Sequence, residues 1–175
     1  MDTEYFSSRI RTIPDWPEPG VQFRDITPLL RDGKAFHALI DVFALRYADA
    51  SIDAVAGIEA RGFIIGAALA YRLGCGFIPV RKAGKLPFDT YGETYSLEYG
   101  TSVVEVHTDA AEIGEHILVV DDLIATGGTF LATARLMQRL GAQIVEAAAV
   151  IDLPALGGSR RLDEAGMRHF ALLKF

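Results

Sequence analysis

The sequence predicts an α/β fold, with a parallel sheet covered by helices on both of its faces. Short apolar runs that are typical of strands alternate with segments whose apolar residues recur at helical spacing. This alternation continues along the chain without internal repeats or low-complexity linkers, as in βαβ folds. The chain has 175 residues, of which 50% are hydrophobic, so it can bury a sizeable core and is expected to form one domain.

The periodicity of apolar residues places the elements along the chain. Helical spacing is found near Tyr5–Ile10, Lys34–Tyr47, Phe63–Leu73 and Thr129–Leu140. Strand-like runs are found near Ala54–Gly57, Gly76–Val80, Ser102–Val106, His116–Asp121, Ile144–Ile151 and His169–Lys174. The last of these is expected to be an edge strand. Ligands of such sheets bind beyond the carboxyl ends of the strands, so the segments that follow the strands are the candidates for a site.

A proline-rich segment, Ile13–Pro28, lies before the first of these sheet strands and holds four of the seven prolines of the chain. Proline fixes its own φ and lacks a backbone donor. We therefore expect an ordered but irregular flap there rather than a helix.

The first strand–loop–helix unit leads from Ala54–Gly57 through Glu59, Ala60 and Arg61 into an apolar helix. A cation at a helix N-terminus opposes the helix dipole by about 0.3–1 kcal/mol. Arg61 is therefore better explained if an anion binds between it and the helix. A solvated arginine on a loop is the alternative interpretation.

A basic segment follows the next strand. Arg81, Lys82 and Lys85 place three cations within five residues, and Gly84 and Pro87 interrupt regular structure. The pattern predicts a mobile basic hairpin or lid rather than a core element. A charged surface turn without a function is the alternative.

The most specific pattern is ILVVDDLIATGGT, residues 117–129. Its apolar run delivers Asp121 and Asp122 to the end of a strand, directly before a turn rich in glycine and threonine. Gly127 and Gly128 let the backbone approach an anion closely, and the following helix N-terminus and the threonine hydroxyls favour a phosphate. Ionised carboxylates only accept hydrogen bonds, which suits the vicinal hydroxyls of a ribose. The pattern therefore predicts a sugar-phosphate site, and an ordinary crossover with a glycine turn is the alternative.

Charge, cysteine content and the lack of other motifs exclude several classes. The net charge of −6 and the pI near 5.2 argue against a general nucleic-acid or anionic-membrane binder. A single cysteine, Cys75, excludes an intrachain disulfide framework and fits a reducing compartment. The start of the sequence lacks the regions of a signal peptide, and the longest apolar stretch, Phe63–Val80, is broken by Arg72 and three glycines. Neither a nucleotide P-loop nor a dinucleotide fingerprint follows a strand. We expect a soluble cytoplasmic protein.

Two of these segments resemble motifs of one enzyme family. Residues 117–129 strongly resemble the motif with which type I phosphoribosyltransferases bind phosphoribosyl pyrophosphate (PRPP). There, two acidic residues after an apolar strand precede a Thr/Gly loop. The segment Glu59–Arg61 is similar to the pyrophosphate loop of that family. Family members often have a non-proline cis peptide in this loop, which would here fall between Glu59 and Ala60.

Two further segments resemble the adenine-specific members of the family. R-K-x-G-K-L-P at 81–87, followed by Y-S-L-E-Y-G at 95–100, resembles their flexible catalytic loop. P-x-P-G-V-x-F-R-D-I-T-P at 17–28 resembles the hood that covers the base. The motifs follow the expected order and span Ile13 to about Ile151. The resemblance implies a type I phosphoribosyltransferase-like central parallel sheet flanked by helices, with a small N-terminal hood and a flexible catalytic loop. It implies one domain over residues 1–175, with the N-terminal helix and hood at about 1–33 and the PRPP-binding core at 34–175.

The resemblance also implies a role for individual residues. The ribose and 5′-phosphate of PRPP would contact Asp121, Asp122, Ala125, Thr126, Gly127, Gly128 and Thr129. Pyrophosphate would contact Glu59, Ala60, Arg61, Arg81, Lys82, Lys85 and Tyr99. Adenine would contact Gln22, Phe23, Arg24 and Leu123, although Phe23 can also be read as a core residue beneath the flap. The residues implied in catalysis are Arg61, Lys82, Lys85 and Glu98, with Glu98 as a proton relay or, alternatively, only a cap of the strand that follows.

The implied reaction is transfer of the 5-phosphoribosyl group from PRPP to N9 of adenine, which gives AMP and pyrophosphate in purine salvage. A cytoplasmic homodimer is expected, with Mg²⁺ held mainly by PRPP and water rather than by dedicated protein ligands. A 6-oxopurine phosphoribosyltransferase would share the two phosphate motifs, but the hood and Y-S-L-E-Y-G argue against it. A non-catalytic PRPP-sensing regulator would be expected to have an added DNA-binding domain or a strongly basic face, and to have lost the lid.

Overall fold

The computed structural model describes residues 3–96 and 100–175. Internal contacts divide the chain into two compact units, Met1–Arg46 and Tyr47–Phe175, and each is described by itself. The predicted division between hood and core lies near residue 33, whereas the unit boundary follows helix α3, because α3 packs on α2 within the first unit. Whether the chain folds as one domain stays a prediction.

The first unit is a short hairpin between helices. Its elements are α1 (Thr3–Ser7), β1 (Arg11–Pro14), β2 (Gln22–Asp25), α2 (Thr27–Arg31) and α3 (Gly33–Arg46). β1 and β2 pair antiparallel, with Ile13 opposite Phe23. The prediction of an irregular flap was therefore wrong for these residues. The prolines do not prevent pairing because they lie at the end of β1, in the connecting loop and in the first turn of α2, where their missing donors are tolerated.

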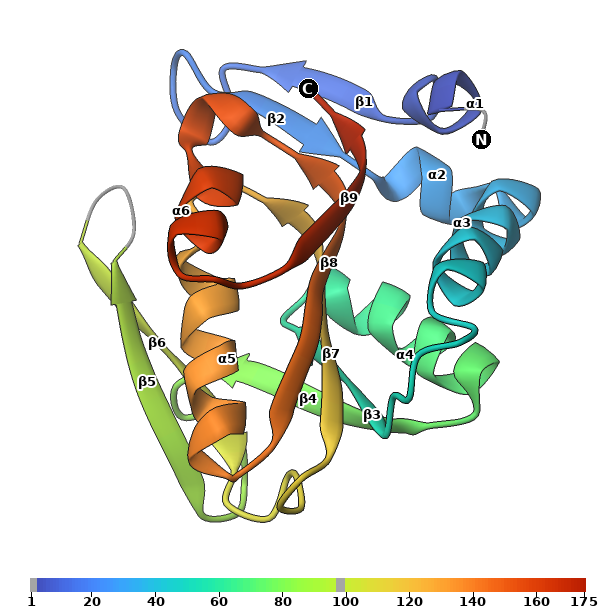
Figure 1. Ribbon diagram of the computed structural model, residues 1–175. Coiled ribbons are helices and arrows are strands. Elements are labelled where there is room, and N and C mark those ends of the chain that lie inside the picture. The colour runs from blue at the N-terminus through green and yellow to red at the C-terminus, as the bar shows by residue number, and fades with distance from the viewer. Residues whose placement is uncertain (1–2, 97–99) are drawn as a thin grey trace. The chain divides into compact units, whose positions relative to one another are not determined.

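The second unit is built on a seven-stranded sheet (Figure 1). Its order is β5-β6-β4-β3-β7-β8-β9, so β9 lies at the predicted edge. The strands are β3 (Ala54–Ile58), β4 (Gly76–Lys82), β5 (Thr90–Ser96), β6 (Thr101–His107), β7 (His116–Ile124), β8 (Gln143–Asp152) and β9 (His169–Lys174). The five strands from β4 to β9 in this order are parallel, as predicted. β6 pairs antiparallel with both β4 and β5, so the sheet is mixed rather than wholly parallel.

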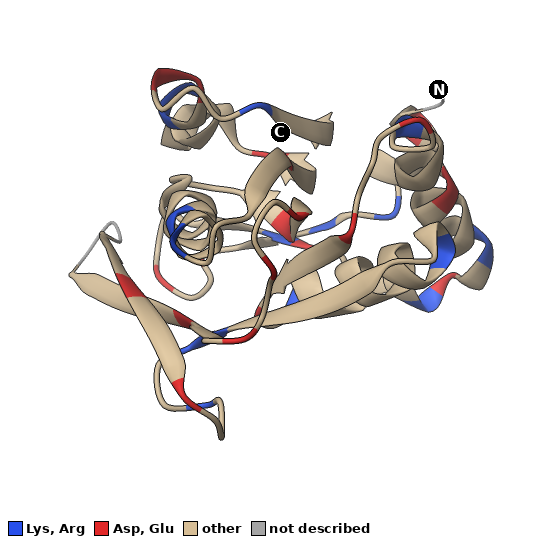
Figure 2. Ribbon diagram, turned by 60° about the horizontal axis from the view of Figure 1, so that its bottom comes forward, with Lys and Arg blue, Asp and Glu red and all other residues tan. Residues whose placement is uncertain are grey.

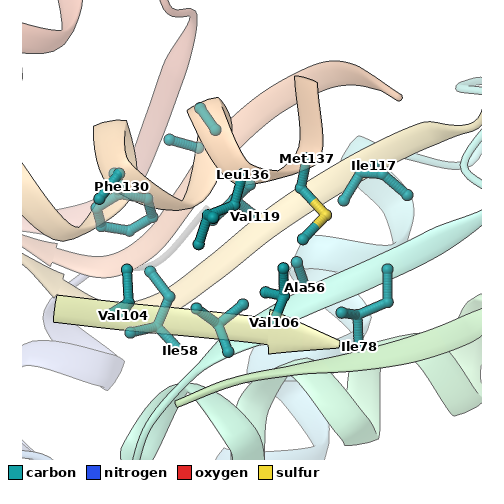
Figure 3. Close-up of a cluster of buried hydrophobic side chains, with 14 of the residues drawn as sticks. Ala56, Ile58, Ile78, Val104, Val106, Ile117, Val119, Phe130, Leu136 and Met137 are labelled. Atoms are coloured by element: carbon teal, nitrogen blue, oxygen red, sulfur yellow. The ribbon is translucent and has the colours of Figure 1, made fainter. Parts of the chain in front are cut away.

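Helices of the second unit pack on both faces of the sheet. They are α4 (Arg61–Leu73), α5 (Gly128–Arg139), the 3₁₀ turn η1 (Pro154–Leu156) and α6 (Gly158–Glu164). α4 packs on β3, β4 and β7. On the other face, the apolar side chains of Phe130, Leu136 and Met137 from α5 point toward Ile58, Val119 and their neighbours in the sheet (Figure 3). This cluster is the core that fixes the start of α5 against the end of β7.

The predicted helices and strands are all present, with ends that shift by up to three residues. The structure adds β1, β2, α2, β5, η1 and α6. β5 has the sequence TYGETYS and therefore lacks an apolar run, and α6 buries only Gly158 and Leu162. Within the described residues, no helix combines the length and apolar character needed to cross a membrane. Basic and acidic residues are spread over helices, strands and loops (Figure 2).

Candidate active site

A pocket of about 410 Å³ lies at the carboxyl end of the parallel strands. Three segments line it: the β3–α4 loop with the start of α4, the end of β4, and the end of β7 with the β7–α5 loop and the start of α5. Its lining consists of Glu59, Ala60, Arg61, Lys82, Asp121, Asp122, Leu123, Ala125, Thr126, Gly127, Thr129 and Phe130. The structure thus brings together most of the residues predicted for the sugar phosphate and for pyrophosphate.

The remaining predicted residues fall into three groups. Gly128 is buried at the start of α5, and Arg81 and Lys85 do not line the pocket but contact Glu59, which does. Gln22, Phe23 and Arg24 lie on β2 of the first unit. Glu98 and Tyr99, the predicted proton relay and a predicted pyrophosphate contact, lie outside the described residues.

Phe130 lines the pocket although the sequence did not predict it there. Its helical spacing assigned it to the core, and it does belong to the buried cluster, with 2% of its surface exposed. A side chain in the first turn of α5 does both, because the pocket opens directly above that core. Its place one residue after Thr129 was the signal that could have identified it.

The β7–α5 loop has the geometry of a phosphate cradle. Gly127 adopts a left-handed conformation with φ 75° and stands at the N-cap of α5, a position that glycine fills with little strain. Because glycine has no side chain to cap the helix, the first N–H groups of α5 are left for an anion. Thr126 and Thr129, whose side chains carry hydroxyls, line the same pocket.

The two aspartates differ in environment. The Asp122 side chain is 4% exposed and pairs with the guanidinium of Arg61. Asp121 accepts a hydrogen bond at 2.8 Å from the backbone N–H of Asp122. Desolvation, followed by repulsion from Asp122, raises the pKa of Asp121 well above its ordinary value, and Arg61 offsets only part of this effect. Burial and the neighbouring carboxylate thus both favour the protonated form of Asp121.

The β3–α4 loop places Arg61 at the first position of α4. The peptide bond between Glu59 and Ala60 is cis. Asp122 supplies a negative charge beside this helix N-terminus, and 38% of the Arg61 side chain remains exposed at the pocket. The cation at a helix start is thus explained by a carboxylate from β7, and it is still placed to meet a ligand.

The predicted adenine contacts come from both units. Phe23 is only partly buried, which argues against the core interpretation, and it packs edge-to-face against Trp16 with ring centroids 4.5 Å apart. Leu123 lines the pocket of the second unit. Whether Phe23 and Leu123 enclose the same base stays a prediction.

A parallel sheet with a phosphate cradle, paired aspartates and a basic loop at one edge defines the class as phosphoribosyltransferase. In agreement, the family model described as phosphoribosyl transferase domain matches residues 29–165. The chain is 60% identical over 173 residues to the adenine phosphoribosyltransferase of Cupriavidus taiwanensis, an alignment that covers 99% of this chain and 91% of that protein.

Solved structures agree with this assignment. The adenine phosphoribosyltransferase of Thermoanaerobacter pseudethanolicus is 46% identical, with a TM-score of 0.95 and 99% of both chains covered. The Saccharomyces cerevisiae enzyme, complexed with D-2,5-dideoxy-2,5-imino-altritol 1,6-bisphosphate and adenine, is 37% identical, with a TM-score of 0.92 and 98% of both chains covered. The chain therefore belongs to the adenine phosphoribosyltransferases, which are pentosyltransferases. The 6-oxopurine and sensor alternatives are not favoured.

Proposed function

We propose that this protein converts adenine and PRPP into AMP and pyrophosphate in the cytoplasm, and that the pocket of the second unit binds PRPP. The observation that carries the proposal is that one pocket joins a phosphate cradle, two aspartates and the Arg61 loop. These three parts match in order the 5′-phosphate, the ribose diol and the pyrophosphate of PRPP.

The phosphate and ribose are bound by opposite kinds of group. The N–H groups at the start of α5 and the hydroxyls of Thr126 and Thr129 hold the 5′-phosphate. Asp121 and Asp122 bind the ribose hydroxyls, and a protonated Asp121 can donate as well as accept a hydrogen bond. Both ends of the sugar are then fixed, which orients C1 for attack.

Arg61, Lys82 and Lys85 act on the leaving group. As the bond from C1 to pyrophosphate stretches, negative charge grows on the departing oxygens, and preorganised cations stabilise that charge. The ribose gains oxocarbenium character at the same time. N9 of adenine then attacks the opposite face of C1, with Glu98 as the proposed proton relay.

Phosphoribosyltransferases generally use Mg²⁺ with PRPP, and the oxygen donors of the pocket suit a hard cation. Asp122 and Glu59 already pair with Arg61 and Lys85. We therefore assign the ion mainly to oxygens of PRPP and water rather than to dedicated protein ligands. When bound, it would offset the charge of the pyrophosphate.

The base is assigned to Phe23 and Leu123 as stacking partners, with the backbone of Gln22 and Arg24 reading its polar edge. Adenine presents an N–H donor where a 6-oxopurine presents an acceptor, and a mismatch of this kind when buried costs about 1–3 kcal/mol. A homodimer is proposed from the family resemblance, and light scattering coupled to size-exclusion chromatography tests it.

The experiment is a panel of bases. Nucleotide formation is followed with PRPP and Mg²⁺ for adenine, hypoxanthine, guanine and xanthine, with a control that lacks base. AMP from adenine alone is the expected result. Turnover confined to 6-oxopurines, or PRPP binding without turnover, would refute the proposal, and an assay repeated with chelator tests the need for the metal.

A further inference from the structure

Glu59 places a negatively charged side chain in the loop that is proposed to bind pyrophosphate, which is itself an anion. An ionised carboxylate accepts hydrogen bonds and donates none, so it offers no favourable contact to a phosphate oxygen. The same pocket already contains Asp121 and Asp122. A third carboxylate would oppose anion binding unless neighbouring cations offset its charge.

The Glu59 carboxylate faces the basic segment, residues 81–85. It accepts a hydrogen bond at 2.9 Å from the backbone N–H of Lys82 and pairs with the ammonium of Lys85. One of its oxygens also lies 3.5 Å from Nε of Arg81. The Glu59 side chain is 11% exposed and that of Lys85 45%, so the carboxylate is the anchored member of this pair.

The protonation state of Glu59 agrees with this geometry. Burial alone would raise the pKa of this carboxyl. The hydrogen bonds from Lys85 and from the Lys82 amide, with the charges of Lys85 and Arg81, outweigh burial and bring the pKa below the ordinary 4.5. Glu59 is therefore ionised at neutral pH.

A second glutamate holds the same segment in a different way. Glu105 accepts a hydrogen bond at 2.9 Å from the backbone N–H of Gly84, and the Arg81 guanidinium donates to the carbonyl oxygen of Lys85 at 3.0 Å. The segment is thus folded back on itself between two carboxylates. Glu59 both orients a lysine side chain and belongs to the pocket, whereas Glu105 does not line the pocket.

We propose that Glu59 is a positioning residue, whose carboxylate holds the Lys85 ammonium and the Lys82 backbone in place beside the pyrophosphate loop. Lys85, rather than Glu59, then meets the leaving group. One carboxylate among three cations reduces their mutual repulsion and still leaves a surplus of positive charge for pyrophosphate. The inference rests on the proposed function, and it leaves Ala60 and Arg61 as the parts of the loop that touch the ligand.

A double-mutant cycle tests whether Glu59 acts through Lys85. The parent, E59Q, K85A and E59Q/K85A are compared for kcat and for KM of PRPP. E59Q keeps the shape of the side chain and an acceptor for the Lys82 amide but removes the charge. We expect kcat to fall about tenfold in E59Q, without a lower KM for PRPP, and by less than about twofold when E59Q is added to K85A.

Three kinetic results would overturn the inference. One is a lower KM for PRPP with kcat retained in E59Q, because Glu59 would then only repel the ligand. Another is a loss of kcat from E59Q that is as large in the K85A protein as in the parent. The last is the same loss in E105Q, the control that removes the β6 carboxylate that accepts from the Gly84 N–H and leaves Glu59 and the three cations unchanged. A parent that forms no AMP would refute the proposed function instead.

Amine labelling tests the pairing without any turnover, so it also covers variants with low activity. Each protein is treated briefly with acetic anhydride, and the acetylation of Lys85 is measured by mass spectrometry relative to the exposed Lys174. We expect Lys85 to react severalfold faster in E59Q than in the parent, and E105Q to match the parent. Equal labelling of Lys85 in the parent and in E59Q would overturn the pairing.

Discussion

Replacing Gly158 by alanine is expected to lower kcat/KM for PRPP about a hundredfold, through the phosphate loop rather than through any contact with substrate. Gly158 is the first residue of α6, and its backbone packs on the β7–α5 loop. A Cβ at this position would lie 2.2 Å from the carbonyl oxygen of Ala125 and 2.8 Å from the backbone nitrogen of Gly127. Both contacts are with backbone atoms, which cannot rotate away.

The size of the effect follows from that overlap. Carbon and carbonyl oxygen normally approach to about 3.3 Å, so one of the two segments must move by about 1 Å. Misplacing a binding group by about 1 Å can lower the rate about a hundredfold, which corresponds to about 2.7 kcal/mol of transition-state stabilisation. We expect the loss to appear in KM for PRPP and in kcat, with little change in binding of adenine by itself.

The control is alanine at Gly157, the preceding residue. Gly157 has φ 75°, and a Cβ there would meet only Arg160 Nη2, at 3.5 Å. G157A should therefore strain the start of α6 by about 1–2 kcal/mol without displacing the phosphate loop. The assays are steady-state kinetics and thermal unfolding of both variants. Activity of G158A within threefold of the parent, or equal losses of kcat/KM in both variants, would refute the reasoning.

Three further predictions concern Asp122, Asp121 and Phe23. Asp122→Asn removes the buried partner of Arg61 and should raise KM for PRPP about tenfold or more; turnover and PRPP binding equal to the parent would contradict the ribose role. Asp121→Asn should raise the thermal midpoint at pH 7, because an acid whose pKa is raised on folding destabilises the protein as pH rises above its unfolded value of 3.8. The gain should disappear below that pH in thermal melts, and a gain of equal size at low pH would contradict the charge explanation. Phe23→Ala should raise KM for adenine about tenfold, by loss of stacking of about 1–3 kcal/mol, with KM for PRPP nearly unchanged; the reverse pattern in steady-state kinetics would remove Phe23 from the base site.

Local patterns were enough to predict the parts of the pocket. One continuous stretch of sequence contains the strand that carries Asp121, the glycines that follow it and the helix that begins at Gly128. The same holds for β3, the loop at Glu59–Arg61 and α4. Because parallel strands all end at the same edge of a sheet, these two stretches could be expected to meet.

Elements without a periodic apolar pattern were not predictable in this way. β5 is held by pairing along β6 and by packing on α5, where Arg135 pairs with Glu93 and the Arg139 guanidinium lies 3.9 Å from the ring centroid of Tyr91. Its own sequence gives no strand signal. The hairpin β1–β2 was missed for a similar reason. The prolines around it argued against regular structure, and the two strands become evident only when they are seen to pair.

The sequence by itself determined the fold class, the main helices and parallel strands in their order along the chain, and the chemical character of the loops at Glu59–Arg61 and residues 121–129, because periodicity and motif spacing are local properties. Only the tertiary structure decided which charges neutralise each other. Arg61 pairs with Asp122, Lys85 with Glu59, and Gly158 packs on Ala125. Each of these contacts joins different segments of the chain, and its energy depends on distance and burial, which no single stretch of sequence encodes.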